Sequence, residues 1–224
     1  YICISRPRRF GKSIAANMLS AYYTCEYDSR ELFSNLKIAS SDSYEKHLNK
    51  YDVIFLNMQE FLSQSSNVEE MLSLLKKSVI WDLLDKYPDF RYFDETNLMR
   101  TLQDIYNKTK RPFVVIIDEW DCIFREYITD KKAQEKYLDF LRDLLKDKGY
   151  VALAYMTGIL PIAKYSSGSE LNMFWEYTMA SETKYNEYFG FTDSEVDQLY
   201  EKYTRNTREI YISREDLKEW YDGY

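Results

Sequence analysis

The chain has little of several residue types, and each shortage excludes a class of protein. Its 224 residues include three cysteines, Cys3, Cys25 and Cys122, which lie far apart and show no paired spacing for zinc. An odd cysteine count does not indicate a disulfide framework, so a reducing cytoplasm is the simplest compartment. The one histidine, His47, has no cysteine or carboxylate at ligand spacing and is interpreted as a surface residue.

Long apolar runs and excess positive charge are also missing. No run approaches the ~18 residues that a membrane span needs, and no signal sequence opens the chain. The net charge of -7 argues against a protein that binds nucleic acid through overall positive charge, so any basic site must be local. The chain begins inside an apolar run without a methionine, which indicates a fragment of a longer protein.

Strand-like and helix-like segments alternate along the chain, and the hydrophobic content of 45% is enough for a buried core. Apolar runs predict strands at 1–5, 51–58, 113–117, 151–156 and 174–181. Helical spacing predicts helices at 14–22, 68–84, 96–109 with Thr96 as N-cap, 137–145, and 192–203 with Thr192 or Asp193 as N-cap. Strands separated by helices predict an α/β fold with a mainly parallel sheet flanked by helices.

The last part of the chain is expected to be separate from this core. The polar stretch 161–170 is predicted to form a loop, and 192–203 is the helix with the clearest start signal. We expect a core over residues 1–190 and a short helical extension over 191–224 that is incomplete at its C-terminus.

The stretch "RPRRFGKS", residues 6–13, lies between the first strand and the first helix and ends like a phosphate-binding loop. Such a loop requires G-x-x-x-x-G-K-[ST], because backbone N–H groups and the helix N-terminus must point at the phosphates. Gly11 would allow close backbone approach, Lys12 would contact the β and γ phosphates, and Ser13 would give its hydroxyl to Mg²⁺.

The first half of this loop departs from the pattern. Arg6 stands where the first glycine belongs, and Pro7 follows it and removes one N–H donor. Taken alone, "GKS" is a weak signal and is more consistent with an exposed basic helix start whose lysine is solvated. Arg8 and Arg9 lie inside the loop and are suited to phosphates, to an acidic surface, or to a nucleic-acid backbone.

The segment "VVIIDE", residues 114–119, has the form of a second nucleotide motif. Its buried strand would deliver Asp118 to the Mg²⁺ shell and Glu119 to the attacking water as general base. The structural alternative is an acidic pair at the solvent edge of a sheet. Thr157 follows the next strand and is a candidate for sensing the γ-phosphate, or else an ordinary turn or cap hydroxyl.

The predicted sheet topology strengthens the interpretation of the two motifs and Thr157 as one nucleotide site. Ligands of open α/β sheets bind beyond the carboxyl ends of the strands, and Lys12, Asp118 and Thr157 all follow such ends. The late arginines Arg205, Arg208 and Arg214 are more typical of a solvated surface than of an arginine finger, so no finger is assigned. The 22 tyrosines are spread along the chain and indicate core packing more than base stacking.

With these motifs the chain resembles the bacterial predicted AAA-ATPase-like proteins, whose first motif reads "RPRRFGK[ST]". The likeness extends to "IDE", "TGILPIAK", "EYFGFTDSEV" and "EWYDGY" and so covers nearly the whole chain. Members often carry a restriction-endonuclease-like nuclease domain after "WYxGY", which this chain does not include.

The resemblance implies a P-loop ATPase domain that binds ATP and Mg²⁺. It implies Gly11, Lys12 and Ser13 as the nucleotide loop, Asp118 and Glu119 as the metal and base carboxylates, and Thr157 near the sensor position. We also expect nucleotide contacts from Arg8, Arg9 and Phe10, metal binding by Ser13 together with Asp118, and catalytic roles for Glu119 and Thr157. Turnover would drive a change in an attached module, such as the nuclease, or in a homo-oligomer. The alternatives are a nucleotide-dependent switch or scaffold that does not hydrolyse ATP, and direct nucleic-acid binding through Arg6, Arg8 and Arg9.

Overall fold

A computed structural model describes residues 1–165, 171–179, 184–207, 209 and 211–221. The predicted loop at 161–170 and the closing "EWYDGY" therefore lie partly outside the described residues. The chain forms two compact units, Tyr1–Glu182 and Thr183–Tyr224, which are described separately. The predicted boundary after residue 190 stays a prediction.

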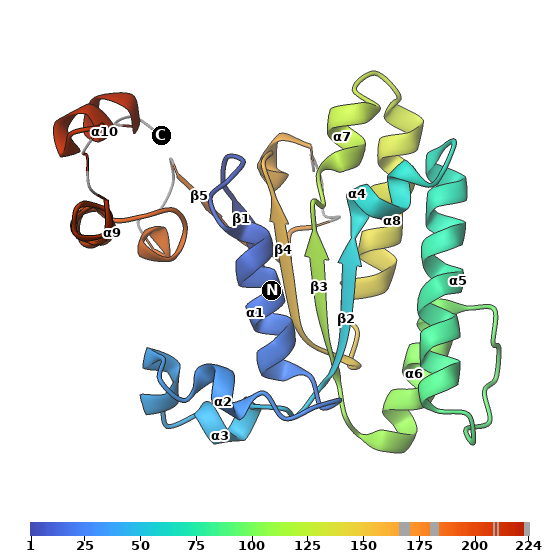
Figure 1. Ribbon diagram of the computed structural model, residues 1–224. Helices are drawn as coiled ribbons and strands as arrows, with labels where there is room; N and C mark the ends of the chain where they lie inside the picture. Colours follow the sequence, from blue (N-terminus) through green and yellow to red (C-terminus); the bar gives the residue numbers. More distant parts are fainter. Residues whose placement is uncertain (166–170, 180–183, 208, 210, 222–224) are drawn as a thin grey trace. The chain divides into compact units, whose positions relative to one another are not determined.

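Five parallel strands form the centre of the first unit (Figure 1). They are β1 (Ile2–Ser5), β2 (Asp52–Asn57), β3 (Phe113–Asp118), β4 (Val151–Gly158) and β5 (Trp175–Thr178). Their order in the sheet is β2-β3-β4-β1-β5. All five match predicted strands, and the predicted parallel α/β fold is confirmed.

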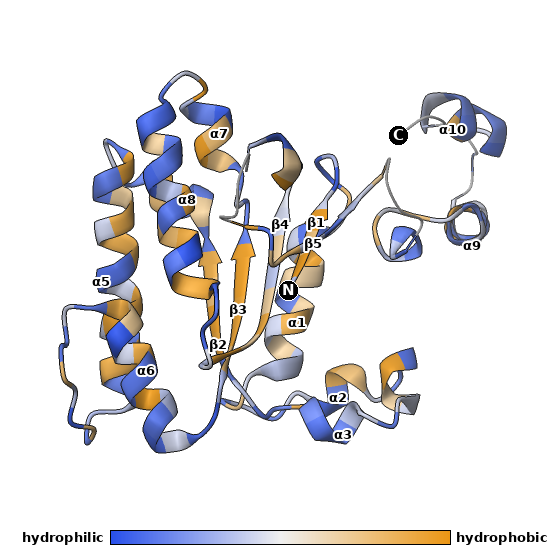
Figure 2. Cartoon of the chain, turned by 180° about the vertical axis from the view of Figure 1, so that it is seen from behind, coloured by the Kyte–Doolittle hydropathy of each residue, from blue (hydrophilic) through white to orange (hydrophobic). Residues whose placement is uncertain are grey.

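The long helices cover both faces of this sheet, with α1 (Lys12–Tyr23) against β2, β3 and β4 on one face. Figure 1 and Figure 2 show the other long helices on the opposite face of the sheet, and Figure 2 shows that each carries both hydrophilic and hydrophobic residues. These are α5 (Val68–Lys86), α6 (Leu98–Thr109) and α8 (Lys131–Leu145). Each begins at a side-chain cap, from Asn67, Asn97 and Asp130 respectively.

Strand β3 runs through the middle of the core, and all six of its residues are buried. Successive strand side chains point to opposite faces, so Phe113, Val115 and Ile117 pack into the core beneath the long helices. Val114 and Ile116 lie on the face that α1 covers. An apolar run without alternation is what a strand covered on both faces requires.

Two sequence expectations are wrong in detail. The cap of α6 is Asn97 rather than Thr96, because the backbone N–H and hydroxyl of Thr96 both donate to the Asp94 carboxylate. The polar stretch after β4 is not only a loop, since it contains the 3₁₀ helix η2 (Ile162–Lys164).

Several short elements complete the first unit, and the sequence did not predict them. Between α1 and β2 lie α2 (Arg30–Phe33), η1 (Lys37–Ser40) and α3 (Tyr44–His47). A separate small core holds this segment together, made of Tyr22, Phe33, Tyr44 and Leu48. The short helices α4 (Met58–Ser63) and α7 (Cys122–Glu126) directly follow β2 and β3.

The second unit contains η3 (Asn186–Tyr188), α9 (Asp193–Asn206) and α10 (Arg214–Tyr221). Thr192 caps α9 in a capping box with Glu195, which confirms one of the two predicted caps. Among the described residues of both units, no helix is long and apolar enough to cross a membrane.

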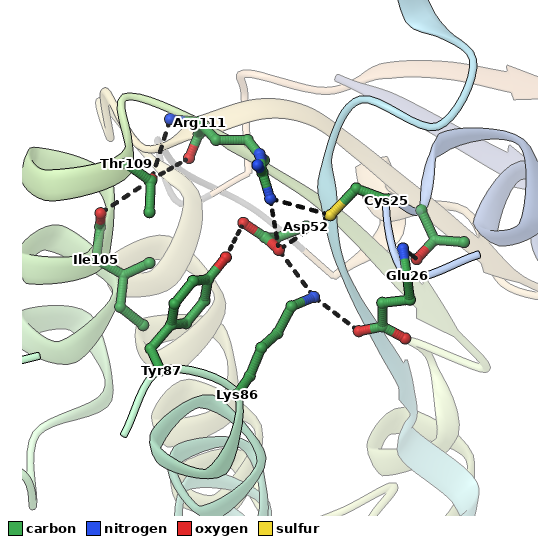
Figure 3. Close-up of polar contacts among 9 residues, drawn as sticks. Cys25, Glu26, Asp52, Lys86, Tyr87, Ile105, Thr109 and Arg111 are labelled. Carbon is green, nitrogen blue, oxygen red and sulfur yellow. Dashed lines mark hydrogen bonds and ion pairs between the residues drawn. The ribbon is translucent and has the colours of Figure 1, made fainter. Parts of the chain in front are cut away.

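A buried carboxylate joins four segments at the amino end of the sheet (Figure 3). Asp52, at the start of β2, is 2% exposed and accepts from Tyr87 Oη at 2.8 Å, while Lys86 Nζ lies 2.8 Å from its Oδ1. Arg111 Nη1 lies 3.7 Å from the same oxygen, and the Cys25 thiol donates to it at 3.5 Å. Burial and then the Asp52 charge raise the pKa of Cys25, so the thiol stays a donor. We call these five residues the Asp52 cluster.

Candidate functional site

The carboxyl ends of three adjacent strands bring the predicted site residues to one edge of the sheet. In the register of the sheet, Asp118 of β3 pairs with Asn57 of β2, and Ser5 of β1 pairs with Gly158 of β4. Thr157 precedes Gly158 and lies beside Asp118. The loop that follows Ser5 and the turn that follows Asp118 therefore flank the end of β4.

The loop of residues 6–11 ends at Gly11, which caps the start of α1. Gly11 has φ +81°, a left-handed conformation that glycine adopts without the cost that a Cβ brings, and an added Cβ would meet nothing within 4 Å. No side chain caps α1, and its first turn carries no acidic residue. The first N–H groups of this 12-residue helix, together with Lys12, therefore favour an anion.

Lys12 is the buried cation of the site, only 5% exposed. Its ammonium donates to the carbonyl oxygens of Arg6 at 3.0 Å and Pro7 at 2.9 Å, so it holds the loop in a closed turn. Burial lowers the pKa of Lys12, while the charges of Glu119 and Asp118 oppose that shift. Lys12 thus lies within electrostatic reach of both predicted carboxylates.

Arg6, in the place of the first loop glycine, is a structural residue. It is 2% exposed, and its Nη1 donates to the carbonyl oxygens of Ser5 at 3.0 Å and Tyr177 at 2.8 Å. Its backbone N–H donates to Gly158 at 3.1 Å. The side chain therefore ties the start of the loop to β5, and Arg6 is not part of an exposed basic patch.

The neighbouring arginines differ from Arg6. Arg8 and Arg9 are exposed, and neither forms a hydrogen bond or ion pair with another described residue. Arg9 has φ 71°, which is costly for a residue other than glycine. Phe10 is half-buried, and Ser13 is exposed in the first turn of α1. Two cations and one hydroxyl therefore remain free to meet a ligand at the loop.

Asp118 and Thr157 form a buried pair between β3 and β4. The Thr157 hydroxyl donates to Asp118 Oδ1, which also accepts from the Glu119 N–H at 3.1 Å. Thr157 is fully buried, so in this conformation it orients the carboxylate. No described residue donates to the other oxygen, Oδ2, which is the geometry that a metal ligand needs.

Glu119 begins a tight turn after β3. Its φ of 55° lies in the left-handed region, a strain of about 1 kcal/mol for a residue with a Cβ. Its carboxylate forms an ion pair with Arg125 of α7, which also lies 3.4 Å from Asp121 Oδ2 through its Nε. The carboxylate of the predicted general base is therefore already in an ion pair.

Trp120 and Asp121 continue this turn and are fully buried. The backbone N–H of Trp120 donates to the carbonyl oxygen of Thr157 at 3.0 Å. Asp121 Oδ2 accepts from the backbone N–H groups of Ile159 at 3.1 Å and Leu160 at 2.9 Å. Trp120 therefore packs within the core and does not cover a base. These hydrogen bonds hold the turn after β3 against the loop after β4.

The sequence did not single out Asp121 or Arg125. Their i, i+4 spacing after an acidic strand end was the available signal, since such a pair lies on one face of a helix. The late arginines belong to the second unit, where Arg205 pairs with Glu201, and Arg214 pairs with Asp193 and Asp197. Arg208 lies outside the described residues.

The residues at this edge are compatible with Mg²⁺ held together with phosphates. Within the part of the chain that the structure describes, no group of three or more His, Cys, Asp or Glu side chains is arranged to hold a metal by itself. Mg²⁺ commonly takes one or two carboxylates and completes its shell with phosphates and water. Asp118 Oδ2 and the Ser13 hydroxyl are the two protein oxygens that fit this scheme.

Comparison with known proteins shows a family match and a curated relative. The family model described as "Predicted AAA-ATPase" matches residues 1–167, which include β1 to β4 and every site residue named in the loop and the turn. A curated relative from Azotobacter chroococcum mcd 1, the "Uncharacterized protein in vnfD 5'region", is 21% identical over 227 residues. The alignment covers 99% of this chain and 41% of that protein, so the chain spans less than half of its relative.

Proposed function

This chain belongs to the Predicted AAA-ATPase family, and on that premise we propose that it binds Mg²⁺-ATP at the carboxyl edge of its sheet and hydrolyses it. The observation that carries the proposal is the burial of Lys12 at the start of α1, within electrostatic reach of Asp118 and Glu119. A cation, two carboxylates and an uncapped helix start meet at the edge where open α/β sheets bind ligands.

Each residue has a chemical task in this proposal. Lys12 leaves the Arg6 and Pro7 carbonyls for the β and γ phosphates, while Arg8, Arg9, Phe10 and the Gly11 backbone border them. Ser13 and Asp118 would hold Mg²⁺, which when bound neutralises phosphate charge. Thr157 keeps Asp118 oriented as the γ-phosphate is bound.

Hydrolysis requires Glu119 as a general base. Water attacks the γ-phosphorus while its proton passes to the Glu119 carboxylate, and the bond to the bridging oxygen breaks to release ADP and phosphate. We propose that this turnover changes the shape of an attached or partner module in the cytoplasm. The attached nuclease and a homo-oligomer are the two forms of partner that the family resemblance implies.

The ion pair of Glu119, the proposed general base, favours a second function. Glu119 is paired with Arg125, and Lys12 is bonded to loop carbonyls, so both reactive groups are occupied. A nucleotide-dependent switch that binds ATP without hydrolysing it would fit this arrangement. Tight Mg²⁺-ATP binding together with undetectable phosphate release distinguishes the switch from the ATPase.

Calorimetric titration of Mg²⁺-ATP into the wild type, Lys12→Ala and Lys37→Ala tests the proposal. Lys37 is an exposed lysine of η1 and serves as the matched control. We expect the wild type and Lys37→Ala to bind alike and Lys12→Ala to bind at least about a hundredfold more weakly, since two charged hydrogen bonds are lost. Equal binding by Lys12→Ala would contradict the proposed site.

A further inference from the structure

Arg125 is a basic residue of this edge that the proposed reaction does not yet use. It lies on α7, and its side chain is 18% exposed. Its guanidinium pairs with Glu119 through Nη2 and lies 3.4 Å from Asp121 Oδ2 through Nε. A guanidinium has five N–H donors, and only Nη2 is bonded to Glu119, so Arg125 retains the capacity to bind another anion.

The two carboxylates beside Arg125 are held differently. Asp121 is fully buried and anchored by the N–H groups of Ile159 and Leu160, so it is a fixed partner. The Glu119 carboxylate is one quarter exposed, and Arg125 is the one described side chain that binds it. Asp121 is therefore a fixed partner of Arg125, whereas the Glu119 carboxylate can be replaced by another anion.

Arg125 also lies close to where phosphates are proposed to bind, because its partner Glu119 directly follows Asp118, whose carboxylate accepts hydrogen bonds from the Glu119 N–H and the Thr157 hydroxyl. The pKa of Lys12 is lowered mainly by burial, and the charge of Arg125 contributes in the same direction. Two cations that repel each other across this edge are jointly stabilised by an anion placed between them. The terminal phosphate of ATP carries more charge and more acceptor oxygens than the single carboxylate of Glu119.

We propose that Arg125 is a specificity-determining residue that exchanges Glu119 for the γ-phosphate and so distinguishes ATP from ADP. The exchange releases the Glu119 carboxylate for the attacking water only when a γ-phosphate is present. This inference rests on the proposed nucleotide site, and it adds a residue that neither the loop nor the "IDE" motif contains. It also explains why the Glu119 carboxylate is paired with Arg125 in the protein without nucleotide.

Competition for Arg125 is tested by measuring the affinities of Mg²⁺-ADP and of a non-hydrolysable β,γ-imido analogue of Mg²⁺-ATP. The proteins are the wild type, Arg125→Ala, Arg125→Lys, Glu119→Gln and the double variant Arg125→Ala/Glu119→Gln. We expect Arg125→Ala to lose about tenfold in affinity for the analogue and none for ADP, since one charged contact is lost. Arg125→Lys, which keeps the positive charge, should bind the analogue with an affinity between those of the wild type and Arg125→Ala.

Glu119→Gln removes the competing charge and should bind the analogue several-fold more tightly, with ADP affinity unchanged. That gain should vanish in the double variant, because both changes act through the same guanidinium. Equal losses for both nucleotides in Arg125→Ala, or a gain that persists in the double variant, would overturn the inference while leaving the nucleotide site intact. A folded wild type that binds neither nucleotide would overturn both proposals.

Discussion

The two ends of the sheet both bury a carboxylate among cations, but they satisfy it differently. At the amino end, Asp52 uses both oxygens for Lys86, Tyr87, Arg111 and the Cys25 thiol (Figure 3). At the carboxyl end, Asp118 leaves Oδ2 without a donor from the described residues, and buried Asp121 Oδ1 has none either.

This difference distinguishes the Asp52 cluster, which is structural, from the candidate ligand site at the carboxyl end. The Asp52 cluster joins the ends of α1 and α5 to the starts of β2 and β3. Asp52 faces both Lys86 and Arg111, and Glu26 provides a second carboxylate for Lys86. The carboxyl end keeps Arg8 and Arg9 exposed and Lys12 bonded only to carbonyls. Buried polar groups without a protein partner are rare in folded proteins and point to a ligand or a functional role.

The largest effect is expected for Glu119→Gln on ATP turnover. Removal of the general base should slow phosphate release about a thousandfold without weakening ATP binding, because an amide cannot accept the proton of the attacking water. The measurement is steady-state phosphate release, with the exposed neighbour Glu126→Gln as matched control. Unchanged turnover in Glu119→Gln would remove this residue from the mechanism.

Asp52→Asn should be the most destabilising change at the amino end. It leaves Lys86 and Arg111 without their buried counter-charge, so we expect a loss of about 3 kcal/mol in the free energy of unfolding, the low end for buried pairs. Denaturant titration measures this loss. Glu45→Gln is the control, since Glu45 pairs with Arg30 on the exposed surface and should leave the midpoint unchanged. Equal midpoints for both variants would show that Asp52 is not a structural anchor.

A smaller effect is expected for Gly158→Ala at the end of β4. An added Cβ would lie 2.6 Å from the Trp120 ring and 2.8 Å from Asp121 Oδ1, so the turn after β3 must shift. We expect a loss of about 2 kcal/mol in the free energy of unfolding. Gly149→Ala is the matched control, because its nearest neighbour is 3.9 Å away. If both variants are equally stable, the packing of the turn against β4 is not tight.

The sequence predicted the sheet because its strands are short apolar runs and the segments between them show helical spacing. The segment from 24 to 50 was not predicted, since its three short elements have four residues each and show no period. Their stability comes from contacts of Tyr22, Phe33 and Tyr44 that only the folded chain brings together. The strand order likewise depends on long-range packing and does not follow from the periodicity of single segments.

The site was predicted where a motif fixes a backbone position, and missed where side chains meet through the fold. Gly11 and Lys12 lie at the helix start because a strand and a helix flank them. Arg6 was identified as a departure from the loop pattern, but its bond to Tyr177 depends on β5 lying beside β1. The pairing of Arg125 with Glu119 depends on the left-handed turn at Glu119, which no residue pattern indicates.

The most direct test of the contrast between the two ends is the shift in melting temperature that Mg²⁺-ATP causes in the wild type, Lys12→Ala and Asp52→Asn. A ligand that binds only the folded state raises the melting temperature according to its affinity. We expect Asp52→Asn to melt earlier without ligand but to gain about as much as the wild type, and Lys12→Ala to gain nothing. A full gain in Lys12→Ala, or none in folded Asp52→Asn, would contradict the assignment of binding to the carboxyl end and of stability to the amino end.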